Sequence, residues 1–215
     1  MKSYFILGTD TDCGKTYATV ALLTYLRQQN LQARALKPVA SGCQEINGIM
    51  QNDDVARLQS ANQDTTIPIC QWMMHPPIAP HLAAKEAGFS ITSAKIKAFY
   101  ESYPKQDLDY LLIEGAGGLF VPLNDQETWV DFLYHSRMPV ILIVGMRLGC
   151  INHALLTAYA LRKHHIACEG WIANFLDPQM VMADRNLETL QQWIHFPFLG
   201  EIPFEGSFQP QQGFA

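Results

Sequence analysis

Short apolar runs recur along the chain, and each is followed by a turn and then by an amphipathic stretch. The runs lie at residues 4–7, 33–37, 110–113, 140–144, 170–173 and 198–202. Uninterrupted apolar runs of this length are typical of parallel strands that are covered on both faces. The stretches between them carry apolar residues at helical spacing, as at Ala18, Ala21, Leu22, Tyr25 and Leu26. The alternation predicts a doubly wound α/β fold with a mainly parallel sheet and right-handed crossovers.

Length and composition fit one globular domain. The chain has 215 residues, of which 48% are hydrophobic and 16% charged, and its net charge is −5. We therefore expect a single domain over residues 1–215, with residues 205–215 as a loop or disordered tail. No basic block suggests nucleic acid or an anionic membrane surface as a partner. No signal-peptide pattern and no apolar run near the ~18 residues of a membrane span are present, so a cytoplasmic location is expected.

The cysteines predict reduced thiols rather than a disulfide framework. They are odd in number and include no C-x-x-C pair: Cys13, Cys43, Cys70, Cys150 and Cys168. Two Cys/His spacings, at residues 150–153 and 165–168, could suit zinc, but ordinary helix positions explain them better.

The stretch "GTDTDCGKT", residues 8–16, reads almost like a phosphate-binding loop. It follows an apolar strand and opens a helix, so main-chain N–H groups and the helix dipole would favour an anion there. The first glycine of the usual pattern is replaced by Thr9, which makes this a deviant Walker A loop. Lys15 is expected to reach the β- and γ-phosphates of a nucleotide and Thr16 to bind Mg²⁺. The alternative is a plain strand-to-helix turn with a solvated lysine.

Two further motifs lie at strand ends that a parallel sheet would bring to the same edge. In "EGAGG", Glu114 ends an apolar run as a candidate metal ligand, and small residues follow it. In "KPVASG", Lys37 ends another run and Ser41 follows. A lysine beside a phosphate loop can neutralise charge during phosphoryl transfer, although an isolated strand-end lysine is more often simply exposed. Both Lys15 and Lys37 are expected in a solvated pocket, with little part in stability.

The three motifs, together with "VGMRLGCINHALLT", "GWIAN" and "LGEIP", strongly resemble the dethiobiotin synthetase family over residues 3–205. The resemblance implies a homodimer with a phosphate-loop fold. It also implies a reaction in which 7,8-diaminopelargonic acid, CO2 and ATP with Mg²⁺ form the ureido ring of dethiobiotin. One amine captures CO2 as a carbamate, the γ-phosphate activates it as a mixed anhydride, and the second amine closes the ring.

The same resemblance assigns roles to individual residues. Lys15 and Lys37 would flank the transferring phosphoryl group, with Thr11 and Ser41 hydrogen-bonded to the carbamate or amine. Thr16, Asp54 and Glu114 would hold Mg²⁺; the sequence alone does not separate Asp54 from Asp53. Asn152 would reach the substrate across the dimer interface, although by itself it could equally be a helix cap. The nucleotide site would comprise Asp12, Cys13, Gly14, Lys15, Thr16, Tyr17, Asp54, Glu114, Gly115, Ala116, Gly117, Asn174, Phe175, Pro203, Phe204 and Glu205.

The base of the nucleotide is expected to be adenine. Asn174 resembles the asparagine with which GTPases read guanine, but Phe175 replaces the lysine of that pattern. The amide of Asn174 offers one donor and one acceptor, which fits adenine, and the main chain of residues 203–205 would complete the base edge.

One departure and two rivals accompany the resemblance. Asn186 stands where relatives can carry a tyrosine that meets the substrate's carboxylate tail. A switch-type ATPase of the same superfamily would have a lysine five residues before Lys15, where this chain has Asp10. A non-catalytic nucleotide-binding module would leave Thr11, Lys37 and Ser41 without a task.

Overall fold

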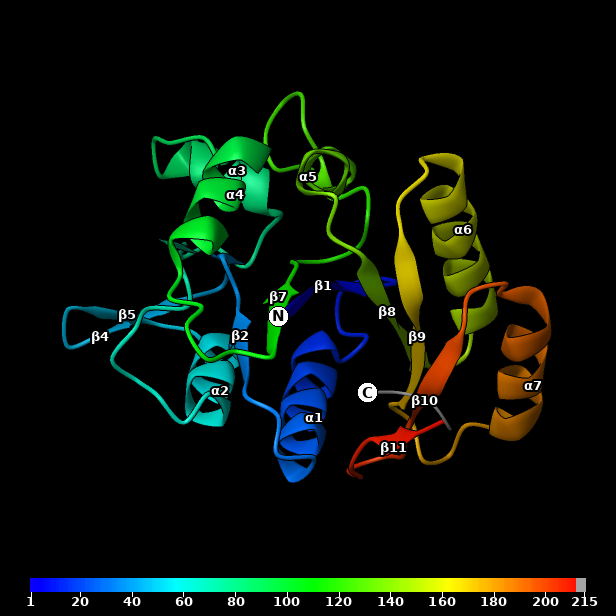
Figure 1. Cartoon of the computed structure of the whole chain (residues 1–215). Coiled ribbons are helices and arrows are strands. Elements are labelled where there is room, and N and C mark those ends of the chain that lie inside the picture. Colours follow the sequence, from blue (N-terminus) through cyan, green and yellow to red (C-terminus); the bar gives the residue numbers. More distant parts are fainter. Residues whose placement is uncertain (212–215) are drawn as a thin grey trace.

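A seven-stranded sheet forms the centre of the protein in a computed structural model, which describes residues 1–211 (Figure 1). The strand order is β11-β10-β9-β8-β1-β7-β2, and β11 alone among these runs antiparallel to its neighbour. The strands are β1 (Lys2–Gly8), β2 (Ala33–Leu36), β7 (Tyr110–Glu114), β8 (Val140–Met146), β9 (Cys168–Phe175), β10 (Phe198–Ile202) and β11 (Gln209–Pro210). The predicted α/β fold is confirmed.

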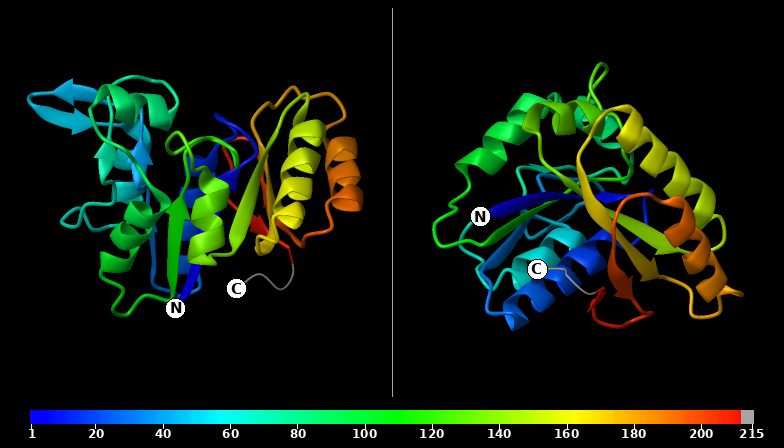
Figure 2. Two further views of the ribbon diagram at one scale, coloured as in Figure 1. Left: turned by 90° about the horizontal axis from the view of Figure 1, so that it is seen from above. Right: turned by 45° about the vertical axis from the view of Figure 1, so that its right-hand side comes forward.

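Helices cover both faces of this sheet, which explains the unbroken apolar runs. Every residue of β7 and of β8 is buried. On one face lie α1 (Lys15–Gln28) and α2 (Asp53–Ala61), whereas α4 (Ser93–Ser102), α5 (Trp129–Ser136) and α6 (Cys150–Lys163) lie on the other (Figure 2). The short α3 (Pro80–Glu86) precedes α4, and α7 (Ala183–Trp193) packs beside α6. Phe5 of β1 contacts Trp129 and Phe132 of α5 in the core.

The chain changes direction at β1, and this fixes the place of the site. From β1 the chain crosses to β2 at one edge, and the later strands build back past β1 toward the other edge. β1 therefore lies between β7 and β8, with Ile6 paired to Glu114 on one side and to Ile141 on the other. Ligands of open α/β sheets bind beyond the carboxyl ends of the strands at such a switch point.

The segment between β2 and α3 is more structured than the sequence indicates. The short helix expected near residues 53–59 is present as α2, and Asn52 caps it by accepting a hydrogen bond from the N–H of Val55. In addition, β3 (Val39–Ala40) pairs with β6 (Trp72–Met73). β4 (Gln44–Ile46) and β5 (Ile49–Gln51) form a projecting hairpin (Figure 2). Its turn residues Asn47 and Gly48 both have positive φ angles, as a tight hairpin turn requires.

The C-terminal segment from residue 205 is turn and loop as far as residue 211, except for the two-residue strand β11. Phe208 is buried, and β11 pairs with β10 through Glu201 and Gln209. The apolar contact of Phe208 with the ring of Tyr25 on α1 supplies the physical reason for this pairing. Residues 212–215 of the predicted tail lie outside the described residues.

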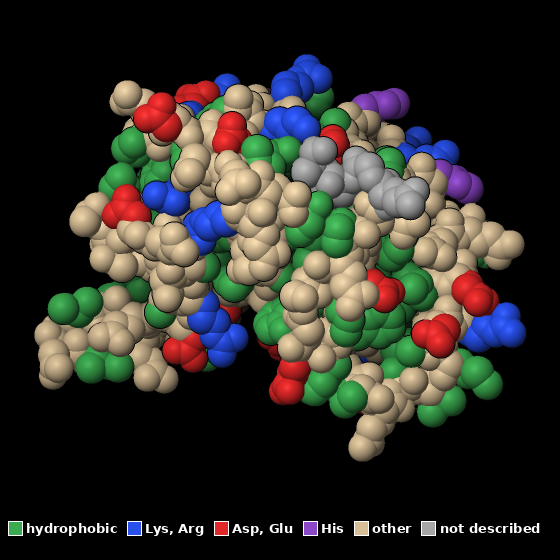
Figure 3. Space-filling view, turned by 60° about the horizontal axis from the view of Figure 1, so that its bottom comes forward, with side chains coloured by type: hydrophobic (Ala, Val, Ile, Leu, Met, Phe, Trp, Pro, Cys, Tyr) green, Lys and Arg blue, Asp and Glu red, His purple; other side chains and the backbone are tan. Residues whose placement is uncertain are grey.

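Acidic, basic and hydrophobic side chains are interspersed on the face drawn in Figure 3. Outside the part that the grey atoms cover, no patch of a single charge is visible on this face. Among residues 1–211, no helix combines the length and the apolar character needed to cross a membrane.

Candidate active site

The phosphate loop connects β1 to α1 at the switch point. Gly14 precedes α1 with a φ of 79°, and a Cβ there would come within 2.1 Å of the Asn174 Nδ2 atom, so only glycine fits. The Lys15 ammonium donates a hydrogen bond to the main-chain oxygen of Asp10 at 2.8 Å. The lysine is thus held against its own loop, at a helix start suited to an anion.

Glu114 lies fully buried at the end of β7 and is the centre of a polar cluster. Its Oε1 atom accepts hydrogen bonds from Thr16 Oγ1 and from Lys37 Nζ, both at 2.6 Å. Its Oε2 atom lies 2.9 Å from the hydroxyl of Thr19. A buried carboxylate is stable only when paired and hydrogen-bonded, and this cluster provides both.

Lys37 forms a second ion pair, with Asp54 at the start of α2. The Nζ–Oδ2 distance is 3.1 Å, and the Lys37 side chain is 7% exposed against 46% for Asp54. Burial on its own would lower the pKa of Lys37, but the carboxylates of Glu114 and Asp54 together raise it above its ordinary value. Burial would likewise raise the pKa of Asp54, but Lys37, Thr16 and the charge of Arg57 hold that pKa below its ordinary value. The expectation of a solvated position is therefore wrong for Lys37, which as a whole residue is 5% exposed because the pairing of β2 with β7 places it beside Glu114. It is also wrong for Lys15, which is 8% exposed.

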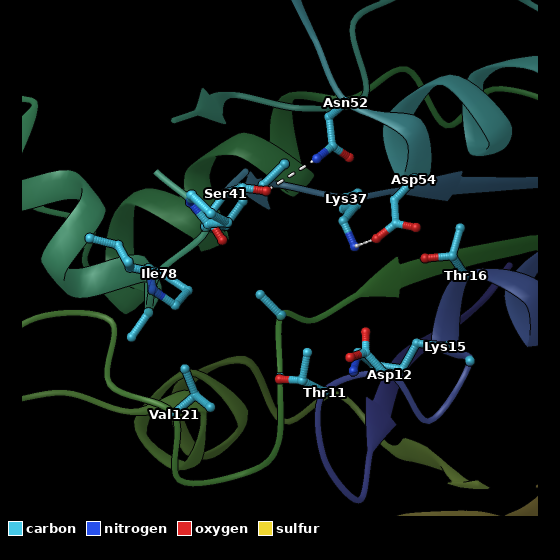
Figure 4. A pocket seen from close by; sticks show the side chains of 18 of the residues that line it. Thr11, Asp12, Lys15, Thr16, Lys37, Ser41, Asn52, Asp54, Ile78 and Val121 are labelled. Atoms are coloured by element: carbon cyan, nitrogen blue, oxygen red, sulfur yellow. Dashed lines mark hydrogen bonds and ion pairs between the residues drawn. The ribbon is translucent and has the colours of Figure 1, made fainter. Parts of the chain in front are cut away.

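A pocket of about 610 Å³ opens above this cluster (Figure 4). Figure 4 shows Lys37 and Asp54 pointing toward one another, with Thr16 beside them and Thr11, Asp12 and Lys15 along the phosphate loop. The structure brings these sequence-predicted residues together as its lining: Thr11, Asp12, Gly14, Lys15, Thr16, Tyr17, Lys37, Ser41, Asp54, Ala116 and Gly117.

The other predicted residues do not line this pocket. Glu114 and Cys13 are fully buried beneath it. Asn152 is exposed near the start of α6, and Asn186, near the start of α7, donates a hydrogen bond to the main-chain oxygen of Met182. The remaining predicted site residues that lie outside the pocket lining are Gly115, Asn174, Phe175, Pro203, Phe204 and Glu205.

Several lining residues were missed in the sequence. Asn52 donates from Nδ2 to the main-chain oxygen of Ser41 at 3.2 Å, and its position before a helix was a cap signal that could have identified it. Arg57 lies one turn after Asp54 on α2. The proline-rich stretch after β6 closes the far side of the pocket with Pro77, Ile78, Ala79 and Pro80.

An ion pair joins the phosphate loop to the loop before α6. Arg147 donates from its guanidinium to the carboxylate of Asp10, and His153 Nδ1 lies 3.7 Å from the same carboxylate. Asp10 occupies the position at which a switch-type ATPase would have its additional lysine. In this chain the residue at that position, Asp10, instead forms an ion pair with Arg147.

Asn174 contacts the phosphate loop from the end of β9. It is 2% exposed, and its Nδ2 atom donates to the main-chain oxygen of Cys13 at 3.0 Å. Nδ2 also lies 3.5 Å from the main-chain oxygen of Gly14, so the amino group of the amide faces the phosphate loop, which differs from the expectation that both halves face a base. Nearby, the Tyr17 hydroxyl donates to the main-chain oxygen of Gly206 at 2.8 Å, so residues 203–206 lie against the start of α1.

The donor set of the buried cluster suits Mg²⁺. It comprises one hydroxyl and two carboxylates: the Lys37 ammonium pairs with Asp54 and Glu114, and Thr16 donates to the same Glu114 oxygen as Lys37 does. Oxygen ligands of this kind, beside a phosphate loop, are those with which proteins hold magnesium and its nucleotide.

Comparisons with known proteins identify relatives of nearly the same length. Residues 2–212 match the family model described as "AAA domain". The chain is 46% identical over 206 residues to the "ATP-dependent dethiobiotin synthetase BioD" of Legionella pneumophila (strain Paris), covering 96% of this chain and 95% of that protein. It is 43% identical over 216 residues to the protein of the same name from Aromatoleum aromaticum, covering 98% and 94%.

Solved structures support the fold alone. The chloroplast FtsY of Physcomitrella patens superposes with a TM-score of 0.57 at 18% identity, covering 98% of this chain. The cell division protein FtsY of Thermotoga maritima gives 0.56 at 13% identity, again covering 98%. This chain spans 62% and 65% of those two chains. The near full-length matches to the curated relatives decide the family: this chain belongs to the ATP-dependent dethiobiotin synthetases.

Proposed function

We propose that this protein uses ATP to carboxylate and close 7,8-diaminopelargonic acid into dethiobiotin, with release of ADP and phosphate. The observation that carries the proposal is the convergence of Lys15, Lys37, Thr16 and Glu114 at one edge of the sheet, in a chain of this family. Two lysines and a hydroxyl around one pocket suit a reaction in which the protein positions reactants and neutralises phosphoryl charge.

Each polar group has a task in that reaction. Lys15, at the start of α1, would exchange its bond to the Asp10 carbonyl for the phosphates of ATP. Lys37 would stabilise the negative charge of the carbamate and of the transferring phosphoryl group. Thr11 and Ser41 line the pocket and would orient the carbamate or the second amine. Thr16, Asp54 and Glu114 would hold Mg²⁺, which supplies charge neutralisation at the phosphate oxygens.

The base would be read beside the phosphate loop. Asn174 lies there, and its Oδ1 atom can accept from the exocyclic amine of adenine while Nδ2 holds the Cys13 carbonyl. The main chain of residues 203–205 would complete the base edge, and Tyr17 fixes that segment through Gly206.

We further propose that the active form is a homodimer in which the 149–157 segment of α6 meets a second copy. Leu148, directly before that segment, is 96% exposed, and Leu156 within it is 60% exposed, so apolar side chains of this region face outward. Asn152, exposed on the same segment, would then face the partner's substrate. The five cysteines are free thiols, in keeping with a cytoplasmic enzyme.

The test is product formation with each substrate omitted in turn. Dethiobiotin is measured by mass spectrometry, and ADP is measured in parallel with ATP, Mg²⁺, bicarbonate and the diamine. We expect ADP and dethiobiotin only when all four components are present, and we expect Lys37→Met to lower the rate of formation of both by about 100–1,000-fold. Lys97→Met, which removes a lysine paired with Glu101 on α4, is the matched control and should retain activity. ADP release at full rate without the diamine would instead identify a switch-type ATPase.

A further inference from the structure

The Lys37 ammonium and a metal ion bound by Asp54 and Glu114 would occupy the same position. The Lys37 ammonium lies 2.6 Å from Glu114 Oε1 and 3.1 Å from Asp54 Oδ2. Thr16 donates to that same Oε1 atom at 2.6 Å. These are the three side chains to which the proposed function assigns Mg²⁺, so the ammonium lies among the ligands.

We infer that Lys37 acts as the resident counter-cation of the metal site, and that it moves into the pocket toward the substrates only when Mg²⁺ takes over Asp54 and Glu114. Catalytic positioning of Lys37 is then conditional on metal binding. The inference rests on the proposed function for the assignment of the metal ligands.

The electrostatics of the cluster support such an exchange. Glu114 is fully buried, and an unpaired carboxylate at that depth would be strongly unfavourable, so the site requires a cation at all times. A divalent ion satisfies both carboxylates and repels an ammonium at contact distance. Lys37 directly follows the last residue of β2, Leu36, and it lines the pocket, so its side chain has space to turn into that pocket.

Lys15 shows that this behaviour belongs to Lys37 and not to pocket lysines in general. Its ammonium binds the main-chain oxygen of Asp10 and lies 3.9 Å from the Cys13 sulfur. It forms no ion pair with Asp54 or Glu114 in the described part of the chain. A lysine of the same charge, in the same pocket, thus provides a matched control.

The exchange is tested by metal binding without nucleotide. Mn²⁺, an ion of the same oxygen preference, is titrated by electron paramagnetic resonance into the wild type, Lys37→Met and Lys15→Met. We expect Lys37→Met to bind Mn²⁺ at least about ten-fold more tightly than the wild type, since no ammonium has to leave. Lys15→Met should show a much smaller gain, because it only reduces the general positive charge of the pocket. Equal affinity of Lys37→Met and the wild type, or an equal gain in both variants, would overturn the inference.

A second measurement does not depend on how well the variants fold. In the wild type, the reductive methylation of each lysine is followed by mass spectrometry in EDTA and in MgCl2. Lys37 should be modified slowly in EDTA and faster in Mg²⁺, whereas a lysine held by the carboxylates in both conditions would contradict the exchange.

If Lys37→Met unfolds in EDTA, Lys37→Gln, whose amide can still donate to Glu114, replaces it in the titration. If the wild type makes dethiobiotin but neither the gain in Mn²⁺ affinity nor the change in Lys37 methylation is seen, only the exchange of Lys37 for Mg²⁺ is contradicted. If the wild type makes no dethiobiotin, the proposed function is contradicted instead.

Discussion

The side-chain amide of Asn174 donates a hydrogen bond to the main-chain oxygen of Cys13, at 3.0 Å, and so ties the end of β9 to the phosphate loop. The closeness of the two is also evident at Gly14, where no Cβ fits beside the amide. The base recognition proposed for Asn174 would therefore be linked to the shape of the phosphate loop through one side chain.

Asn174→Ala is expected to lower the free energy of unfolding by about 1–3 kcal/mol, because it leaves a buried carbonyl unsatisfied. It should also remove the preference for ATP over GTP, which we expect to be worth about 1–3 kcal/mol in the natural protein. Competition of ATP turnover by GTP measures the second effect and urea unfolding the first. An unchanged preference in Asn174→Ala would show that the base is read elsewhere.

Lys37→Met should lower both activity and stability. We expect a loss of about 3–4 kcal/mol of transition-state stabilisation. The free energy of unfolding without metal should fall by about 3–5 kcal/mol, because Glu114 loses its buried partner. Lys15→Met should match the loss of activity with a smaller loss of stability. Calorimetry in EDTA and steady-state kinetics distinguish the two variants; equal melting temperatures for both would contradict the buried pairing.

Arg147→Met should impair catalysis more than folding. The Asp10 and Arg147 side chains are 25% and 41% exposed, so their pair contributes at most about 1 kcal/mol to stability. The Asp10 carbonyl holds Lys15, however, and a displaced loop is expected to lower kcat/KM by about 10–100-fold. Arg185→Met, which removes an exposed ion pair with Glu188, is the control. In a double-mutant cycle with Asp10→Asn, the coupling energy is calculated from kcat/KM. A value near zero would show that the Asp10–Arg147 pair does not position the phosphate loop.

Leu148→Asp should weaken the proposed dimer and reduce activity in parallel. A carboxylate in an apolar interface between copies would be buried without a partner. Val181→Asp changes a side chain that is 81% exposed between β9 and α7, outside residues 148–157, and should leave the dimer intact. Sedimentation velocity over a range of concentrations measures the assembly. A wild-type monomer with full activity would refute the proposal.

Acid should weaken the Lys37–Asp54 pair. The folded-state pKa of Asp54 lies below its ordinary value of 3.8, so the pair stabilises the fold above about pH 4 and is lost as pH falls further. The raised pKa of Lys37 means that its contribution persists through neutral pH and disappears only in strong alkali. The stability difference between the wild type and Asp54→Asn should thus shrink below about pH 4 in urea unfolding. The control is Asp53→Asn, since Asp53 forms no ion pair with Lys37 among residues 1–211.

The sequence was sufficient for the fold and for the lining residues of the phosphate loop and the strand ends, but not for Asn52, Arg57 and the proline-rich stretch. Apolar runs and a Gly-Lys-Thr turn are local patterns, and the parallel sheet then brings strand ends together. The environment of Lys37 was not predictable in this way, because it depends on the pairing of Leu36 with Ile113, which places Glu114 beside it. The dipeptide of β11 likewise has no strand pattern of its own and is fixed by tertiary contacts of Phe208.

The position of β1 in the sheet has a consequence for how the chain folds during synthesis. Its partners are β7 and β8, which begin only at Tyr110 and Val140, and β2 also pairs only with β7. The emerging N-terminal half thus exposes two apolar strands that cannot enter the central sheet until the middle of the chain has been made. Pairing between strands that are distant in sequence slows folding, and the apolar surface exposed in the meantime is prone to aggregation. We therefore expect β1 and β2 to stay exposed until β7 and β8 have emerged from the ribosome, well before the last residue is added.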